Sequence, residues 1–191
     1  MERELESGLV ARLKAGDPSA FEAIYAAYRP RVFTFLARLS RRRDVAEDLA
    51  HETWLRLVTH AHRLADDTSV SAWLFTVARN LYTSWCRHRS VDATRVVDAP
   101  ASWPPPAPGE SPFEAAARNE TERRLERALA RLPLADRELL LMIVIGGLSH
   151  SEAAGAIGLR PEVLRKRLQR ARERLAAELE AEGALGRLKV G

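Results

Sequence analysis

Apolar side chains recur every three or four residues over most of the sequence, and this spacing predicts amphipathic helices. The first clear helix start is Asp17 followed by Pro18, because aspartate caps a helix and proline fits its first position. A second segment begins at Asp44, and a third runs over residues 71–89. The polar stretch 63–71 between them lacks periodicity and predicts a loop.

The two faces of these segments predict what each helix buries. In the second segment the residues spaced to bury one face are Val45, Leu49, Trp54, Leu55 and Val58. In the third segment the apolar stripe holds Leu74, Val77, Ala78, Leu81 and Trp85. At 100° per residue, the opposite side of that helix carries Thr76, Arg79, Asn80, Thr83 and Arg87. This outer face therefore offers cations and hydrogen-bonding groups without a carboxylate.

The periodicity stops after the third segment and returns nearer the C-terminus. Residues 91–117 include the run WPPPAPGESP, which cannot form regular helix hydrogen bonds and is typical of a semi-extended linker. Helical spacing resumes over 120–132 and 134–145, and the second of these ends at Gly146-Gly147. With no strand-like alternation in the sequence, we expect an all-α fold.

A short helix, a turn and a basic helix follow in succession. Ser149 and Glu152 match a capping box, and the helix that they begin should end at Gly158. Pro161 can then take the first position of a last helix, whose inner stripe is Leu164, Leu168, Ala171 and Leu175. The outer face of that helix offers Glu162, Arg165, Lys166, Gln169 and Arg170. This layout is that of a helix-turn-helix, in which the second helix lies in the DNA major groove.

Arginines beyond the centre of that face fit a different role. Arg172 and Arg174 lie toward its flanks, where phosphate contact is the better interpretation. We expect Arg165, Lys166, Gln169 and Arg170 to reach base edges, because they project from the first turns of the helix.

Charge supports this interpretation only weakly. Residues 1–90 hold 14 Lys and Arg against 11 Asp and Glu, and residues 121–191 hold 14 against 10, whereas residues 91–120 hold 2 against 5. Two basic units thus flank an acidic connector, which suits a polyanionic partner but also a solvated surface.

Several function classes are disfavoured by the residues that the chain lacks. The one cysteine, Cys86, rules out an internal disulfide framework. His60 and His62 are two positions apart and His51 lies nearby, but the sequence offers no third ligand at a spacing that suits a metal. We therefore expect no metal and no cofactor. A Gly-rich phosphate loop and a nucleophile motif are also missing, which argues against an enzyme. The acidic N-terminus and the lack of a long apolar run predict a cytoplasmic protein without a signal peptide or membrane span.

Three longer blocks make the interpretation specific. DVAEDLAHETWLRL (44–57) and SAWLFTVARNLYTSWCRHR (71–89) resemble region 2 of the extracytoplasmic-function (ECF) sigma factors of the bacterial sigma-70 family. LARLPLADRELLLMIVIGGLSHSEAAGAIGLRPEVLRKRLQRARERL (129–175) resembles region 4 of the same family. The resemblance implies a helical region 2 over 1–92, a linker over 93–119, a helix-turn-helix region 4 over 120–182 and a tail over 183–191.

The resemblance also implies partners and roles. Region 2 of the family docks on the β′ clamp helices of core RNA polymerase, which nominates Asp48, Glu52, Thr53, Trp54 and Arg56. Residues 63–71 and the outer face of the next helix would hold the melted −10 element, through Arg79, Asn80, Thr83 and Arg87. Region 4 would read the −35 element through Arg165, Lys166, Gln169, Arg170 and Arg172 while its outer surface meets the β flap. An anti-sigma factor is a further expected partner.

The blocks depart from the family pattern at a few positions, and two candidates for base stacking compete. His51, Ser84, His150 and Ala153 replace residues that are more frequent in the family. Tyr82 and Trp85 could both stack on an unpaired base, but Trp85 lies on the apolar stripe and is expected in the core.

Two other hypotheses compete with a sigma factor. A regulator that uses only the C-terminal helix-turn-helix would leave the blocks over 44–89 unexplained. A partner-binding protein such as an adaptor or an anti-sigma factor would not need the basic outer face at 165–170.

Overall fold

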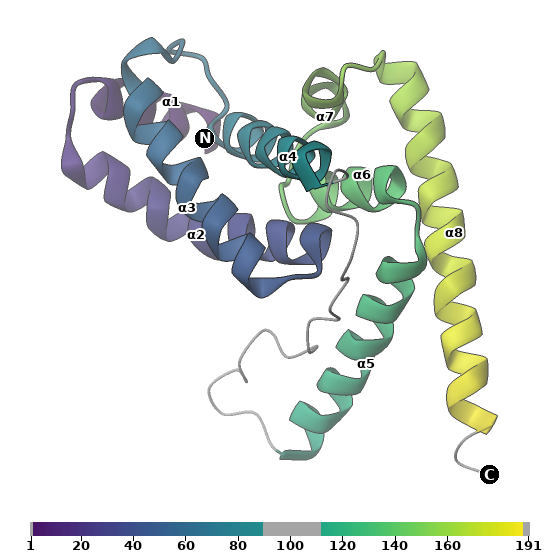
Figure 1. Cartoon of the computed structure of the whole chain (residues 1–191). Helices are drawn as coiled ribbons and strands as arrows, with labels where there is room; N and C mark the ends of the chain where they lie inside the picture. The colour runs from purple at the N-terminus through teal and green to yellow at the C-terminus, as the bar shows by residue number, and fades with distance from the viewer. Residues whose placement is uncertain (1, 90–111, 189–191) are drawn as a thin grey trace.

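The computed structural model describes residues 2–89 and 112–188, and within these ranges the secondary structure is helical without strands. Figure 1 shows the order of the elements. The helices are α1 (Glu2–Lys14), α2 (Pro18–Ser40), α3 (Arg43–His60), the 3₁₀ turn η1 (Ala61–Arg63), α4 (Val70–Arg89), α5 (Pro112–Arg131), α6 (Leu134–Val144), α7 (His150–Ile157) and α8 (Pro161–Leu188). The predicted all-α fold is confirmed for this part of the chain.

Helices α1 to α4 form the N-terminal bundle. The predicted cap of α2 is present, because Asp17 Oδ1 accepts a hydrogen bond from the Ser19 backbone N–H at 2.9 Å. Hydrogen bonds from Ser19 and Arg12 lower the pKa of Asp17 to about 2. Helix α1 was not predicted, yet its Val10 and Leu13 are buried in the bundle. Two buried side chains are a weak periodic signal, so α1 depends on packing against its neighbours.

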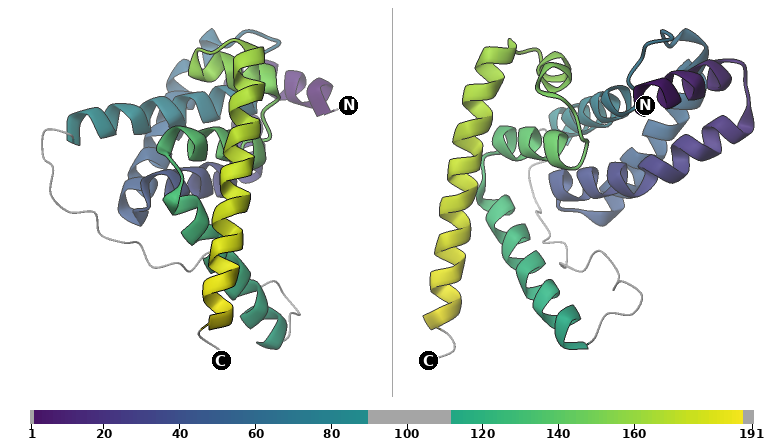
Figure 2. Two further views of the ribbon diagram at one scale, coloured as in Figure 1. Left: turned by 90° about the vertical axis from the view of Figure 1, so that its right-hand side faces the viewer. Right: turned by 180° about the vertical axis from the view of Figure 1, so that it is seen from behind.

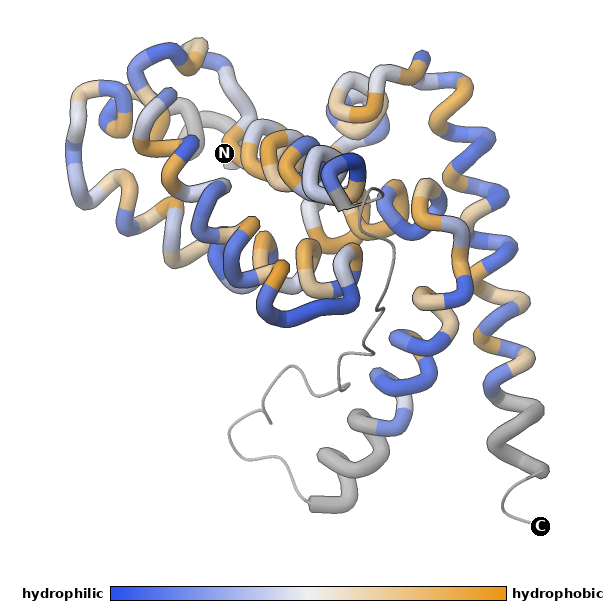
Figure 3. The backbone as a smooth tube through the Cα atoms, in the orientation of Figure 1, coloured by the Kyte–Doolittle hydropathy of each residue, from blue (hydrophilic) through white to orange (hydrophobic). Residues whose placement is uncertain are grey.

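Aromatic contacts hold the bundle together. The rings of Phe35 in α2 and Phe75 in α4 lie edge to face, with centroids 5.2 Å apart, and both side chains are fully buried. Apolar residues of all four helices belong to this core, and hydrophobic segments, in orange, recur along the tube of the bundle in Figure 3. Leu64 and Val70 also enter it, so the predicted loop over 63–71 is anchored at both ends.

Helices α5 to α8 form the C-terminal unit. Its long helix α8 packs against α5, α6 and α7. The capping box of α7 is confirmed, because Ser149 Oγ accepts from the Glu152 N–H while the Glu152 carboxylate accepts from the Ser149 N–H. Gly158 ends α7 with a φ of 71°, a conformation that glycine adopts without steric cost. The predicted helix-turn-helix is therefore present.

The start of α5 corrects the predicted linker. The expected connector covered 93–119, but α5 begins at Pro112 and makes residues 112–119 helical. The sequence there, PFEAAARN, lacks an apolar stripe but is rich in alanine, the strongest helix former. Residues 90–111, which hold most of the expected linker, lie outside the described residues.

The two units are in contact. In the right-hand view of Figure 2, α6 lies between the N-terminal bundle and α8. Helix α2 packs against α6, and α4 packs against α7. Among the helices of residues 2–89 and 112–188, none has both the length and the hydropathy of a membrane-spanning segment.

Candidate nucleic-acid and protein interfaces

The outer face of α8 is the most accessible of the predicted surfaces. All five side chains predicted to meet the −35 DNA are exposed, namely Arg165, Lys166, Gln169, Arg170 and Arg172. The polar contacts found for this face stay within the helix: Gln169 donates to Glu173 at 3.0 Å, and Arg165 lies 3.8 Å from Glu162. The opposite stripe is buried, so the helix docks on its unit by one side and presents the other.

A buried carboxylate holds α8 in this orientation. Asp136 of α6 is almost fully buried and pairs with Arg174, while its other oxygen lies 3.8 Å from Arg167 Nε. Arg174, which we expected to contact phosphate, pairs with Asp136 through Nη1, although 56% of its side chain remains exposed. Its contact with phosphate stays a prediction. The sequence signal for the contact with Asp136 is absent, since the partners are 38 positions apart.

The outer face of α4 is more constrained than that of α8. Arg79 forms an ion pair with Glu138 of α6, which belongs to the other unit. Asn80 is exposed and accepts a hydrogen bond from Arg79 at 3.2 Å, and the Thr83 hydroxyl donates to the Arg79 carbonyl at 2.9 Å. Arg87 is exposed near the end of the helix. The four residues thus share one face, as predicted, but Arg79 is engaged.

Tyr82 and Trp85 of this helix, the two candidates for base stacking, differ in burial. Tyr82 is buried, its hydroxyl donates to the Leu39 carbonyl at 3.0 Å, and burial raises its pKa. Trp85 is half-buried and stacks on the Tyr82 ring, with centroids 6.0 Å apart. Trp85, which the apolar stripe placed in the core, is therefore the more accessible ring, and Tyr82 is the core residue.

The predicted polymerase surface on α3 divides into exposed and buried members. Asp48 is exposed, and Glu52 and Arg56 pair across one helical turn at 3.0 Å with side chains about half accessible. Thr53 is fully buried and donates to the Leu49 carbonyl at 2.7 Å. Trp54 is buried too. These two nominations need correction, because Thr53 and Trp54 can influence a docked protein only through the position of α3.

The reason for the burial of Trp54 is aromatic packing. Its ring contacts Tyr25 edge to face, with centroids 4.8 Å apart, and Phe21 with centroids 6.3 Å apart. It therefore anchors α3 to α2.

An apolar surface on α3 was missed by the sequence reasoning. Leu55 and Val58 were expected in the core, yet their exposed fractions are 48% and 58%. They lie on the outside because α3 buries a narrower stripe than the apolar spacing suggested. Exposed aliphatic side chains next to charged ones are a feature of protein-binding surfaces.

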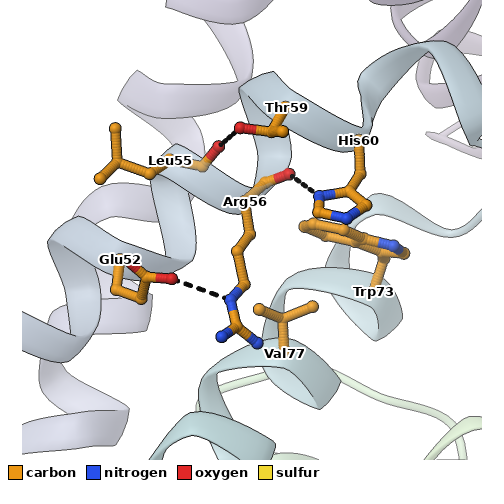
Figure 4. Close-up of a pocket in the computed structure, with 7 residues that line it drawn as sticks. All are labelled: Glu52, Leu55, Arg56, Thr59, His60, Trp73 and Val77. Atoms are coloured by element: carbon orange, nitrogen blue, oxygen red, sulfur yellow. Dashed lines mark hydrogen bonds and ion pairs between the residues drawn. The ribbon is translucent and has the colours of Figure 1, made fainter.

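A shallow hollow of about 650 Å³ lies between α3 and α4 beside this surface. Figure 4 shows the Arg56 side chain reaching from α3 toward Val77 of α4, and the His60 ring beside the indole of Trp73. The lining residues are Glu52, Leu55, Arg56, Thr59, His60, Trp73 and Val77. Within the described residues, no cluster of three or more potential ligands could hold a metal ion.

Comparison with known proteins agrees with this division into two units. Residues 24–91 match the family Sigma-70 region 2, and residues 122–175 match the family Sigma-70, region 4. The chain is 34% identical over 155 residues to the ECF RNA polymerase sigma factor EcfG of Rhodopseudomonas palustris, covering 81% of this chain and 82% of that protein. It is also 34% identical over 177 residues to the RNA polymerase sigma factor CarQ of Myxococcus xanthus, covering 91% and 98%.

Solved structures show the same architecture. The sigma factor RpoE of Bartonella quintana, in complex with the anti-sigma factor NepR, superposes with a TM-score of 0.68 at 26% identity, covering 84% of this chain and 96% of that one. CnrH in complex with the cytosolic domain of CnrY also superposes with a TM-score of 0.68, at 23% identity, covering 92% and 97%, which bears on the fold alone.

The chain therefore belongs to the sigma-70 family, in its extracytoplasmic-function branch. Members of this class are transcription initiation factors of RNA polymerase, and the chain shares that function of promoter-directed initiation.

Proposed function

We propose that the chain binds core RNA polymerase and divides promoter recognition between its two units. The C-terminal unit reads the −35 element as duplex DNA, and the N-terminal bundle melts and holds the −10 element. The observation that carries this proposal is the outer face of α8, whose five polar and basic side chains are all exposed above a buried docking stripe.

The geometry of α8 suits the major groove. The groove admits one helix, and an arginine there can donate two hydrogen bonds to a guanine. Arg165, Lys166, Gln169 and Arg170 follow one another along the exposed face over the first turns after Pro161. We assign these four to base edges and nearby phosphates, and Arg172 to phosphate, where it adds affinity without sequence discrimination.

The outer face of α4 suits a separated strand. Cations neutralise the backbone, and amides or aromatic rings bind an unstacked base. We assign Arg79 and Arg87 to the backbone, and Asn80 and Thr83 to bases. The half-buried Trp85 is a better stacking platform than Tyr82, whose ring and hydroxyl are both used inside the bundle.

The α3 surface suits docking on the β′ clamp helices. Its exposed aliphatic side chains, Leu55 and Val58, lie among Asp48, Glu52 and Arg56. Such a surface combines an apolar centre with charged neighbours that fix the register of a partner. The outer surface of the C-terminal unit would meet the β flap at the same time.

Regulation and location follow from the same proposal. Because the Bartonella quintana RpoE structure contains an anti-sigma factor, we include an anti-sigma protein among the partners of this chain. We place the chain in the cytoplasm, where bacterial transcription takes place, and assign it no catalytic chemistry of its own, because the core polymerase supplies the chemistry of RNA synthesis. We place region 2 within 1–92 and region 4 within 120–182.

The test is run-off transcription with bacterial core polymerase on a cognate promoter, with and without the chain. We expect a promoter-dependent transcript when the chain is present. Asp48→Arg should reduce core binding and transcript without loss of helicity, and Glu22→Arg, at an exposed position of α2, is the matched charge-reversal control. Core binding without any promoter-dependent transcript would favour an adaptor instead.

A further inference from the structure

The C-terminal end of α6 rests on an arginine of the other unit. Arg31 of α2 donates from Nε to the Ile145 carbonyl at 2.9 Å and from Nη2 to the Gly146 carbonyl at 2.8 Å. Because α6 ends at Val144, these carbonyls lie at its negative end, where carbonyl groups lack partners within the helix. Arg31 therefore caps a helix that is 114 positions away in the sequence.

Both sides of this contact are shaped for it. The Arg31 guanidinium lies over the rings of Tyr28, at 5.2 Å, and Phe75, at 6.0 Å, which orient it on the bundle surface. On the other side, Gly147 has a φ of 65°, and a Cβ atom there would lie 2.7 Å from Arg31 Nη2. The positive φ favours glycine at position 147, and any larger residue there would displace the Arg31 guanidinium from its present position.

Two further arginines of the bundle pair with carboxylates of the C-terminal unit. Arg38 of α2 contacts Glu126 of α5 at 2.6 Å, and Arg79 of α4 pairs with Glu138 of α6. All four of these side chains are less than one-third exposed, so solvent screens the pairs less than surface pairs. The three contacts have the same polarity, with cations on the bundle and acceptors on the other unit.

We propose that Arg31, Arg38 and Arg79 form an intramolecular docking surface for the C-terminal end of α6 and its acidic neighbours, and that this docking competes with −10 DNA. The competition rests on the proposed function, because Arg79 is one of the cations assigned to the separated strand. The docked form, which we call the closed state, leaves the outer face of α8 and the α3 surface exposed. The closed chain can therefore meet polymerase and duplex DNA before it opens.

One buried group opposes closure. Arg137 of α6 is 8% exposed, and its Nε and Nη1 atoms are buried without a hydrogen-bond partner. It lies within electrostatic range of Tyr82 and Arg41 of the bundle, and burial lowers its pKa. Donors of a buried cation that lack hydrogen-bond partners carry a desolvation cost. This cost lowers the stability of the closed state and would be relieved when the two units separate. This arrangement suits a reversible contact.

The docking itself can be tested on the full chain without polymerase or DNA, by small-angle X-ray scattering. Glu138→Arg should increase the radius of gyration and the maximum dimension, and the exchange Arg79→Glu with Glu138→Arg should restore the wild-type values. Arg31→Ala should expand the chain as well. Arg43→Ala removes an exposed arginine that pairs within α3 and should change neither value.

The outcomes are distinct. A wild-type profile equal to that of Glu138→Arg, or an expansion of the Arg43→Ala control to the same extent, would overturn the docking. Circular dichroism verifies that each variant keeps its helices. If Arg31→Ala loses helicity, Arg31→Lys replaces it in the test. Lysine keeps the positive charge but cannot donate to both carbonyls as the guanidinium does, and Glu138→Arg tests the docking independently.

Competition is tested with a fluorescein-labelled single-stranded oligonucleotide of the non-template −10 sequence from the run-off promoter. If about a tenth of the chain is open, the apparent Kd is about tenfold weaker than that of the open form, so Arg31→Ala should bind about tenfold more tightly. Unchanged affinity in a variant that scattering shows to be expanded would overturn the competition while leaving the docking. Failure of the proposed function would appear as a missing transcript in run-off transcription. Failure of the docking would appear only in the scattering, so the two outcomes are distinguishable.

Discussion

The two predicted DNA-binding faces have similar residues but differ in what surrounds them. On α8, the basic side chains of the outer face are exposed, and Arg165 lies near Glu162 of the same helix. The buried Asp136 of α6 pairs with Arg174 and so fixes α8 on its unit. On α4, Arg79 is paired with a carboxylate of the other unit, and α7 packs against the same helix. The comparison shows that a polar helical face identifies a candidate surface, whereas its availability depends on the second unit.

The largest expected effect concerns the core of the N-terminal bundle. Phe75→Ala should lower the free energy of unfolding of the N-terminal bundle by about 3–5 kcal/mol, because it leaves a cavity in a close-packed core. Denaturant unfolding followed by circular dichroism measures the loss. Val58→Ala, at an exposed position of α3, is the control and should change stability by less than about 0.5 kcal/mol. Similar losses in both variants would contradict the assigned core.

A smaller effect concerns the exposed face of α8. Arg165→Ala should cost about 1–3 kcal/mol of discrimination between the −35 element and unrelated duplex DNA, because a base contact carries sequence information. Competition binding with fluorescence anisotropy measures the difference. Equal losses on every sequence would instead make Arg165 a phosphate contact.

One substitution at the interface between the units should stabilise the closed state. Arg137→Met replaces a buried cation whose Nε and Nη1 lack hydrogen-bond partners by an apolar side chain of similar length, and should stabilise the closed state by about 1 kcal/mol. The expected result is a profile at least as compact as the wild type in scattering and weaker binding of the single-stranded −10 probe. Expansion of this variant would show that Arg137 supports closure.

The smallest expected effect concerns Arg172, which we assign to general DNA affinity and not to sequence discrimination. Arg172→Ala should weaken binding uniformly across sequences and reduce the slope of log K against log salt by about one, as expected for the loss of one phosphate contact. Titrations at several salt concentrations provide the slope. A change in sequence preference would move Arg172 to the base-reading group.

Local signals in the sequence predicted much of the fold and the α8 face. The capping box of α7 and the proline at the start of α8 depend on neighbouring residues, so the helix-turn-helix and its outer face could be read directly. The start of α5 was missed because alanine-rich helices need no apolar stripe. Asp17, by contrast, carries its own cap signal.

Features that depend on distant packing could not be predicted. Tyr82 and Trp85 are three positions apart on one helix, and the buried one, Tyr82, donates a hydrogen bond to the Leu39 carbonyl of another helix. Leu55 and Val58 fit an apolar stripe but lie outside it. The contact of Arg31 with the end of α6 joins residues more than a hundred positions apart, without a local pattern.

We propose that two helical units bind separate promoter elements on one polymerase. Permanganate reactivity of the holoenzyme on promoter DNA can measure this division, because unpaired thymines react. We expect reactive thymines within the −10 element that disappear when Arg79, Asn80 and Arg87 are replaced together by alanine, and a reduced signal at unchanged positions with Arg165→Ala. Holoenzyme that binds the promoter without reactive thymines, or whose thymine positions change with Arg165→Ala, would contradict it.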